Sequence, residues 1–261
     1  MGKLLAIDGL NIVRRVYEAN MEEDTAAKAD AALRHSVASF RKLLGTHQPT
    51  HVLPAFDFGG HTWRHELYPR YRENRAPMPE VLKERLPDFY LQLAELGLHV
   101  VSVPEVEADD VIATGVLRWL GEGRGEAIIA STDKDLHTLI EHGAVIWDHF
   151  KGEWHDSKWV EAKFGVPPEM LTDLLALMGD VSDSIPGVSK VGVKTAAKLL
   201  QSYGNIDRIM AGAGILKDTL GEKLRKDKDQ LYMSRQLVAL KDDVRMGVTW
   251  NMLAFDAGKL G

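Results

Sequence analysis

Short apolar runs recur along the chain, and longer stretches with helical spacing separate several of them. The runs cover residues 4–7, 52–56, 98–103, 127–130 and 145–147. Apolar runs of this length that alternate with helical segments are typical of a largely parallel sheet connected by crossover helices. The pattern therefore predicts an α/β core.

Two other regions have a different character. Residues 59–90 are rich in arginine, aromatic residues and proline, and we interpret them as a long insertion with helical pieces. From about residue 167, helical patterns are broken by glycine, which is typical of short helices joined by tight turns. Residues 217–240 also have a helical pattern, without recognisable chemistry. We expect a core over residues 1–165 and a helical region over residues 166–261.

Acidic residues stand where the predicted strands and helices meet. Asp8, Asp57 and Asp133 come at or just after the ends of three apolar runs, and ligands of open α/β sheets bind at the carboxyl ends of strands. A carboxylate in such a place is costly to desolvate unless it meets a cation or hydrogen-bond donors. The full set of candidate acids is Asp8, Asp57, Glu107, Asp109, Asp110, Asp133, Asp135, Asp180 and Asp183.

Several acids around one cation point to metal-dependent phosphodiester hydrolysis. Mg²⁺ prefers carboxylate oxygen and retained water, and two such ions can activate a water and stabilise a leaving oxygen. Each group of acids also has an ordinary explanation, because acids at helix starts act as caps and dipole partners, and acids near glycine form turns. The metal-site hypothesis depends on all nine acids together.

Composition narrows the possible functions. The chain has 261 residues, is 45% hydrophobic and contains no cysteine, which excludes disulfides, thiolate metal sites and a cysteine nucleophile. The net charge of -6 argues against a polyanionic partner, but the chain without the nine acids carries +3. An acid at position 8 interrupts the first apolar run too early for a signal peptide, and no run of about 18 apolar residues occurs. We expect a soluble cytoplasmic protein with no membrane partner.

Five segments, in this order, resemble the bacterial and phage 5′ nuclease family, which includes the N-terminal domain of DNA polymerase I. They are residues 4–15, 56–82, 106–113, 131–139 and 179–200. The short chain is most similar to the stand-alone Xni-type flap endonucleases. The resemblance implies a PIN-like 5′ nuclease core with a mixed, mostly parallel central sheet flanked by helices. It also implies a helical arch at residues 59–90 and a helix-hairpin-helix element at about residues 184–204.

The resemblance also assigns roles to the acids. Asp8, Asp57, Glu107, Asp109 and Asp110 match one Mg²⁺ group, and Asp133, Asp135, Asp180 and Asp183 match the acids around a second ion. Asp109 is the best single ligand, one or two ions are possible, and Mn²⁺ is an expected substitute. Arg72 stands where the family commonly has lysine. We assign it to the catalytic group, although a guanidinium differs from an ammonium in geometry.

The arginine-rich segment and the hairpin are the candidate DNA contacts. Arg14, Arg64 and Arg75 are expected to contact phosphates, and the alternative for this segment is a solvated basic helix. At the hairpin, the expected DNA contacts are Lys190, Val191, Gly192, Val193, Lys194 and Thr195. There the alternative is a plain helical hairpin. The resemblance further implies a K⁺ bound by the carbonyl groups of Leu177, Met178, Pro186, Val188 and Val191.

The predicted function is a Mg²⁺-dependent, structure-selective 5′ nuclease. It hydrolyses phosphodiester bonds near the junction of 5′-flap DNA in replication and repair, and no obligatory protein partner is inferred. One alternative is a catalytically weak or inactive protein that binds branched DNA, a hypothesis prompted by Arg72. A second alternative is an RNA substrate, which the arch and hairpin segments disfavour.

Overall fold

The structure is a computed structural model that describes residues 2–213 and 219–260. It consists of two compact units. Unit 1 contains Met1–Gly60, Ala76–Trp154 and Lys241–Gly261, and unit 2 contains His61–Arg75 and His155–Leu240. Among the described residues, no helix is both long and apolar enough to cross a membrane.

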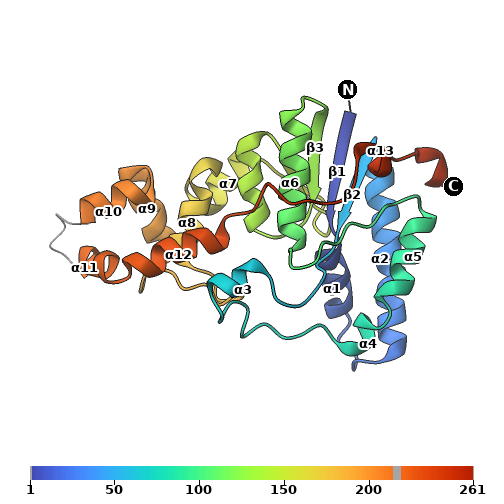
Figure 1. Cartoon of the computed structure of the whole chain (residues 1–261), viewed down its shortest axis with the longest axis horizontal. Helices are drawn as coiled ribbons and strands as arrows, with labels where there is room; N and C mark the ends of the chain where they lie inside the picture. The colour runs from blue at the N-terminus through green and yellow to red at the C-terminus, as the bar shows by residue number, and fades with distance from the viewer. Residues whose placement is uncertain (1, 214–218, 261) are drawn as a thin grey trace. The chain divides into compact units, whose positions relative to one another are not determined.

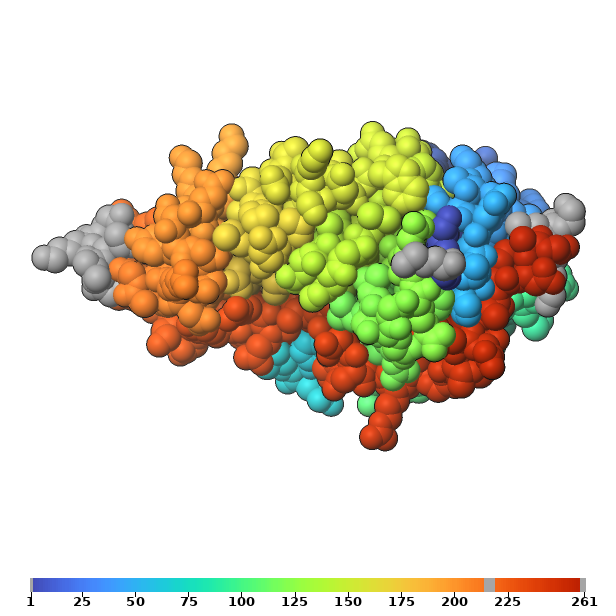
Figure 2. Space-filling model, turned by 90° about the horizontal axis from the view of Figure 1, so that it is seen from above, coloured from blue at the N-terminus to red at the C-terminus, as the bar shows by residue number. Residues whose placement is uncertain are grey.

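A sheet with the order β2-β1-β3-β4-β5 forms the centre of the fold. β1 pairs in parallel with β2 and β3, and β3 pairs in parallel with β4. In the space-filling view, the dark blue start of β1 lies between β2 in light blue and β3 in green (Figure 2). The predicted α/β fold with a mostly parallel sheet is confirmed. The strands are β1 Gly2–Asp8, β2 His51–Ala55, β3 Gly125–Ala130, β4 Val145–Asp148 and β5 Glu153–His155.

Helices cover both faces of the sheet (Figure 1). Leu5 and Ile7 of β1 face a core formed with α1 (Gly9–Ala19), α2 (Ala26–His47) and α5 (Leu86–Glu95). Side chains alternate between the faces of a strand. Leu53 of β2 accordingly points to the other face, where it packs against Gly115 of α6 (Ala108–Gly121). Burial on both faces explains why these strands are continuous apolar runs.

The run at residues 98–103 does not form the predicted strand. Only Val101 pairs with β2, through a single parallel bridge to Ala55. The Val101 N–H donates to the Pro54 carbonyl oxygen, and the Phe56 N–H donates to the Val101 carbonyl oxygen, both at 2.9 Å. Because Pro54 has no N–H, the outer edge of β2 lacks a donor that a longer strand would need. β5, in contrast, is a strand that the apolar pattern missed.

The insertion at residues 59–90 contains helical pieces, as predicted. These are α3 (Trp63–Leu67) in unit 2, and α4 (Glu80–Lys83) and the start of α5 in unit 1. Two short segments close unit 1, namely α13 (Trp250–Leu253) and the 3-10 helix η3 (Ala257–Leu260). The first turn after β3 leads into another 3-10 helix, η1 (Asp135–His142).

The rest of unit 2 is helical. α8 (Leu171–Met178) and α9 (Val193–Tyr203) flank the glycine-rich loop, so a helix-loop-helix element stands where the sequence predicts one. Of the helix predicted over residues 217–240, residues 217 and 218 lie outside the described residues, and the remainder forms two helices. The other elements are α7 Ser157–Phe164, η2 Pro168–Met170, α10 Ile206–Ala213, α11 Thr219–Lys226 and α12 Lys228–Val238.

Candidate active site

Three neighbouring parallel strands deliver acids to one edge of the sheet in unit 1. Asp8 ends β1 and is in register with Ala55 of β2, while Ile7 is in register with Ala130 of β3. The chain continues from β2 to Asp57 and from β3 to Asp133. Because parallel strands end at the same edge, these acids are brought together, as their order in the sequence predicts.

Asp8 is held in place from two sides. Its Oδ1 accepts a hydrogen bond from the Asn11 N–H at 3.1 Å and so caps α1, and its Oδ2 accepts one from the Ser131 hydroxyl at 3.0 Å. The Ser131 hydroxyl also accepts from the Asp133 N–H at 3.0 Å. Sequence reasoning missed Ser131. Its place directly after a buried strand was the signal for a role beside Asp8.

The first turn of α6 contributes the next acids. Asp57 Oδ1 accepts a hydrogen bond from the Ala108 N–H at 2.7 Å, so one candidate ligand caps the helix that carries the others. Glu107 is the N-cap residue of α6, and Asp109 and Asp110 lie in its first turn. Asp110 is fully buried, and its Oδ1 accepts from the Lys241 N–H at 3.0 Å. Asp110 therefore also fastens the chain after residue 240 to α6.

The electrostatics of this edge favour a divalent cation. Burial, followed by repulsion from the nearby carboxylates of Asp133 and Asp57, raises the pKa of Asp8 to about 7. Burial, followed by repulsion from Asp133, Asp8, Asp57 and Glu107, raises the pKa of Asp109 well above its usual range. Clustered carboxylates repel one another when they are ionised, and a nearby cation stabilises their ionised form. The oxygen-only set of ligands fits Mg²⁺.

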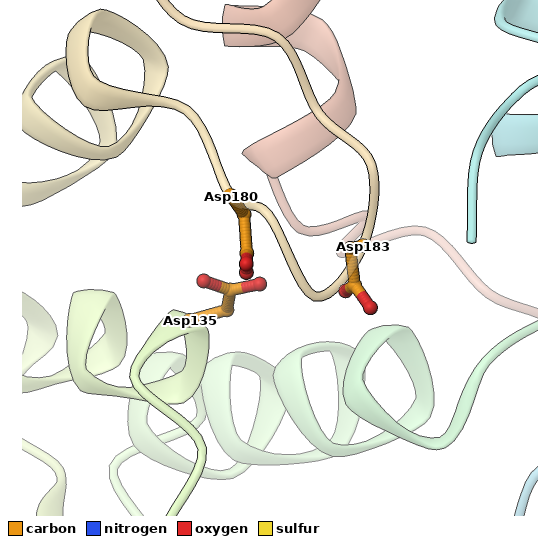
Figure 3. Close-up of side chains that lie close together, drawn as sticks. All are labelled: Asp135, Asp180 and Asp183. Atoms are coloured by element: carbon orange, nitrogen blue, oxygen red, sulfur yellow. The ribbon is translucent and has the colours of Figure 1, made fainter. Parts of the chain in front are cut away.

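The acids predicted to serve a second ion belong to different units. Asp133 and Asp135 lie in unit 1, where the Asp135 N–H donates to Asp133 Oδ1 at 3.0 Å. Asp180 and Asp183 lie in unit 2, on the loop that follows α8 (Figure 3). Asp180 Oδ1 accepts from the N–H and the hydroxyl of Ser182 at 2.8 and 2.6 Å. This turn fixes the side chain of Asp180.

The predicted arginine contacts have different surroundings. Arg14 is half-buried and lies 3.4 Å from Glu18 in an ion pair. Arg64 is 3% exposed, and its guanidinium donates to the carbonyl oxygens of Leu237 and Ala239 at the end of α12. Cations near a helix C-terminus satisfy its last carbonyl groups. The prediction that Arg64 contacts DNA is therefore at odds with its burial, and Arg64 has a structural role in unit 2.

Two glycines bring the ends of the hairpin loop into contact. A Cβ on Gly187 would lie 2.4 Å from the Met178 carbonyl carbon, and one on Gly179 would lie 2.4 Å from the Gly187 nitrogen. The backbone on the two sides of the loop therefore packs directly. The carbonyl groups predicted to bind K⁺ belong to this part of the chain, and K⁺ binding there stays a prediction. The Leu177 and Val188 carbonyl oxygens also accept from Val188 and Val191 N–H groups at 2.8 and 3.0 Å.

One face of α12 supports the hairpin, a role that sequence reasoning missed. Asp227 Oδ2 accepts from the Ser189 N–H at 2.8 Å, and Gln230 Nε2 donates to the Gly187 carbonyl oxygen at 2.7 Å. Ser234 donates to the Pro186 carbonyl oxygen. The signal was the spacing of three polar residues, at positions 227, 230 and 234, along one helical face.

The start of α9 presents main-chain amides and cations together. Gly192 is the N-cap residue and supplies no side-chain cap. Lys190 and Lys194 on either side are exposed, and the first turn of α9 contains no acid. Helix N-termini with uncapped amides bind phosphate. The contact of these residues with a DNA backbone stays a prediction.

The edge of clustered acids and the lysine-bearing hairpin together place this protein in the class of nucleases. A model of the 5′-3′ exonuclease N-terminal resolvase-like domain matches residues 3–165, and a model of the 5′-3′ exonuclease C-terminal SAM fold matches residues 166–259. The chain belongs to the 5′-3′ exonuclease family.

Curated relatives and solved structures agree with this assignment. Flap endonuclease Xni of Shewanella amazonensis is 38% identical over 244 residues, which are 94% of each chain. Flap endonuclease Xni of Psychromonas ingrahamii is 35% identical over 246 residues, again 94% of each chain. Bacteriophage T5 flap endonuclease, solved as a pseudo-enzyme-product complex with DNA and metal ions, has the same fold. Its TM-score is 0.74 at 21% identity, with 90% of this chain and 88% of that one covered.

Proposed function

We propose that this protein is a Mg²⁺-dependent flap endonuclease that cuts DNA near the junction of a 5′ flap. The observation that carries the proposal is the edge of acids in unit 1, where burial and mutual repulsion raise the pKa values of Asp8 and Asp109. The 35–38% identical relatives named Flap endonuclease Xni support the flap substrate. Removal of displaced 5′ flaps in replication and repair is the corresponding cellular role.

Asp8, Asp57, Glu107, Asp109 and Asp110 are the proposed ligands of the first Mg²⁺. A bound Mg²⁺ would lower the pKa of a coordinated water and neutralise charge that develops on the phosphate. The protein's own part is to hold the ligands. Ser131 and the Asn11 N–H orient Asp8, and the Ala108 N–H orients Asp57. The proposed acids for a second ion are Asp133, Asp135, Asp180 and Asp183, and Mn²⁺ is expected to replace Mg²⁺.

Unit 2 is proposed to hold the duplex part of the substrate. Lys190 and Lys194 supply positive charge, and the residues from Val191 to Thr195 supply main-chain amides and a close backbone approach. The fold shared with a nuclease solved together with DNA supports this placement. A K⁺ on the carbonyl groups of Leu177, Met178, Pro186, Val188 and Val191 would add positive charge near a phosphate. Arg14 and Arg75 remain proposed phosphate contacts.

Cleavage of a labelled 5′-flap substrate tests the proposed function. Asp109→Ala and Asp8→Ala are expected to abolish Mg²⁺-dependent cleavage, because each removes a ligand, while binding of the same flap in Ca²⁺ persists. Asp88→Ala, which removes an exposed acid from the first turn of α5, is the control and should cut normally. Undiminished cutting by Asp109→Ala would contradict the assignment.

The alternative is a protein that binds branched DNA without cutting it. The pairing of Arg72 with Asp183 at 3.2 Å motivates it, because both residues are then engaged with each other rather than with substrate or metal. Wild-type protein that binds the flap in Ca²⁺ but cuts nothing in Mg²⁺ or Mn²⁺ would favour this alternative.

A further inference from the structure

Within unit 2, contacts centred on Asp183 fasten residues 71–75 to the loop after α8. The Arg72 N–H donates to the Asp183 carbonyl oxygen at 2.8 Å, and Arg72 Nε donates to Asp183 Oδ1 at 3.2 Å. The Tyr71 hydroxyl donates to Oδ2 at 3.4 Å, and Arg75 Nη1 lies 3.8 Å from Oδ1. A single carboxylate therefore contacts three residues of the arginine-rich segment.

The pair of Arg72 and Asp183 is shielded from solvent, and the backbone near each partner has an unusual conformation. The side chains of Arg72 and Asp183 are only 18% and 12% exposed, and shielding strengthens a pair relative to one at the surface. Arg72 has φ 57° and Ser184 has φ 56°, a left-handed conformation that is unfavourable for residues other than glycine. Asn74 Nδ2 donates to Ser184 Oγ at 3.3 Å and links the same two segments. Local contacts are needed to hold both residues in this conformation.

The arginines and the carboxylate of Asp183 can each bind a different group in place of one another. A guanidinium fork that binds a carboxylate is equally suited to a phosphate. A carboxylate that accepts from guanidinium and phenol groups has less charge to offer to a divalent cation. A DNA phosphate therefore competes with Asp183 for the arginines. A divalent cation competes with the arginines for the carboxylate of Asp183.

We propose that Asp183 is a positioning residue whose carboxylate takes the place of a DNA phosphate on Arg72 and Arg75 until substrate arrives. A phosphate of the substrate displaces the carboxylate, and Asp183 becomes able to bind a divalent cation. This inference rests on the proposed function, because it needs DNA as the displacing group. Since the two exchanges are linked, DNA and divalent metal each raise the affinity of the protein for the other. A lysine at position 72 would lack the Nε donor that holds Asp183 here.

Limited proteolysis without DNA or metal tests the holding contact. In EDTA, Asp183→Asn is expected to speed tryptic cleavage after Arg70, Arg72 and Arg75 by about fivefold or more, because it removes a shielded charged pair. Asp180→Asn, which removes the same charge from the same loop, should be cleaved by trypsin at the wild-type rate. Asp183→Glu should restore protection from trypsin. Equal rates for Asp183→Asn and wild type would overturn the proposal. Circular dichroism must show that each variant is folded.

DNA affinity tests the exchange. In EDTA, Asp183→Asn is expected to bind a 5′-flap duplex about fivefold more tightly than Asp180→Asn, although both variants lose one negative charge. Adding Arg72→Gln should remove most of this gain. In Ca²⁺, affinity should rise more for wild type than for Asp183→Asn. Equal affinities of the two Asp→Asn variants would overturn the exchange.

Failure of the exchange is distinguishable from failure of the proposed function. If no variant binds flap DNA under any condition, the proposed function is contradicted. The tryptic comparison uses no DNA, so it still decides whether Asp183 holds residues 71–75.

Discussion

The Ser131 hydroxyl donates to Oδ2 of Asp8 at 3.0 Å and so connects the ends of β3 and β1. The same hydroxyl accepts from the Asp133 N–H, so it is oriented by the chain that leads to the next acid. A hydrogen bond to a carboxylate favours its charged form, and this bond lowers the pKa of Asp8 against the opposing effect of burial. Ser131 therefore helps to keep Asp8 ready for a cation.

Ser131→Ala should reduce cleavage without unfolding the protein. Loss of a hydrogen bond to a buried carboxylate is expected to lower kcat about tenfold near neutral pH and to move the pH profile toward higher pH. The measurement is the pH dependence of flap cleavage at saturating Mg²⁺. Ser36→Ala is the matched control, since Ser36 is a buried serine of α2 whose hydroxyl donates to the Ala32 carbonyl oxygen. An unshifted profile for Ser131→Ala would contradict this role.

The metal-free protein should lose stability as the pH rises. The pKa of Asp8 is about 7 in the folded protein against an ordinary value of 3.8. The folded state thus binds the proton more tightly, so the stabilisation is complete below pH 3.8 and is lost as the pH rises through 7. Between pH 6 and pH 8 the free energy of unfolding should fall by about 1.4 kcal/mol from this group.

Urea denaturation in EDTA at several pH values measures this slope. Asp8→Asn should flatten it, because an amide does not titrate, and Mg²⁺ should flatten it for wild type by stabilising the charged acids. If the free energy of unfolding of the wild type rises between pH 6 and pH 8 in EDTA, the raised pKa of Asp8 does not determine the pH dependence of stability.

Alternation of apolar runs and helices was enough to predict the sheet and the place of its acids. Asp8, Asp57 and Asp133 could be predicted to meet because parallel strands end at one edge, a rule that needs no side-chain contacts. The failed strand at residues 98–103 shows the limit of that pattern. Its apolar residues resemble a strand, but pairing beyond Val101 depends on donors from β2, where Pro54 has none.

Pairing between distant segments was the other part that the sequence did not reveal. Arg64 could be read as basic and exposed, yet it is buried against carbonyl groups more than 170 residues away along the chain. Similarly, Arg72 and Asp183 are 111 residues apart in the sequence. Local spacing cannot specify such contacts, because they depend on how helices pack.

Asp227→Ala should weaken DNA binding through the hairpin. Asp227 accepts from the Ser189 N–H, and hydrogen bonds from the side chain and then the backbone of Ser189 lower the pKa of its carboxyl. Its loss is expected to destabilise the protein by about 1 kcal/mol and to raise KM more than it lowers kcat, since the bond supports the hairpin and Asp227 is not one of the candidate Mg²⁺ ligands. Kinetics on a 5′-flap substrate measure the effect. Asp229→Ala, which removes an exposed acid from the first turn of α12, is the control, and an equal KM for both variants would count against this support.

Two glycines of the hairpin should respond differently to alanine. At Gly187 the added Cβ would meet Met178 backbone atoms at 2.4 and 2.6 Å, so the loop must move. We expect a loss of about 2 kcal/mol or more in unfolding free energy, together with weaker DNA binding. At Gly192 the Cβ meets nothing within 4 Å, and φ is -100°, which alanine adopts readily. Gly192→Ala should change stability by only about 0.5–1 kcal/mol, the usual range for an N-cap residue.

DNA affinity, compared with stability, distinguishes Gly192→Ala from Gly187→Ala. If the backbone at Gly192 approaches a phosphate, the methyl group of Gly192→Ala collides with the substrate rather than with the protein. Denaturation would then report a stable fold while fluorescence anisotropy reports several-fold weaker binding of a 5′-flap duplex. Wild-type affinity in Gly192→Ala would move the duplex contact away from the start of α9. In that case Lys190 and Lys194, on either side of this glycine, would act through long-range charge and not through a close backbone contact.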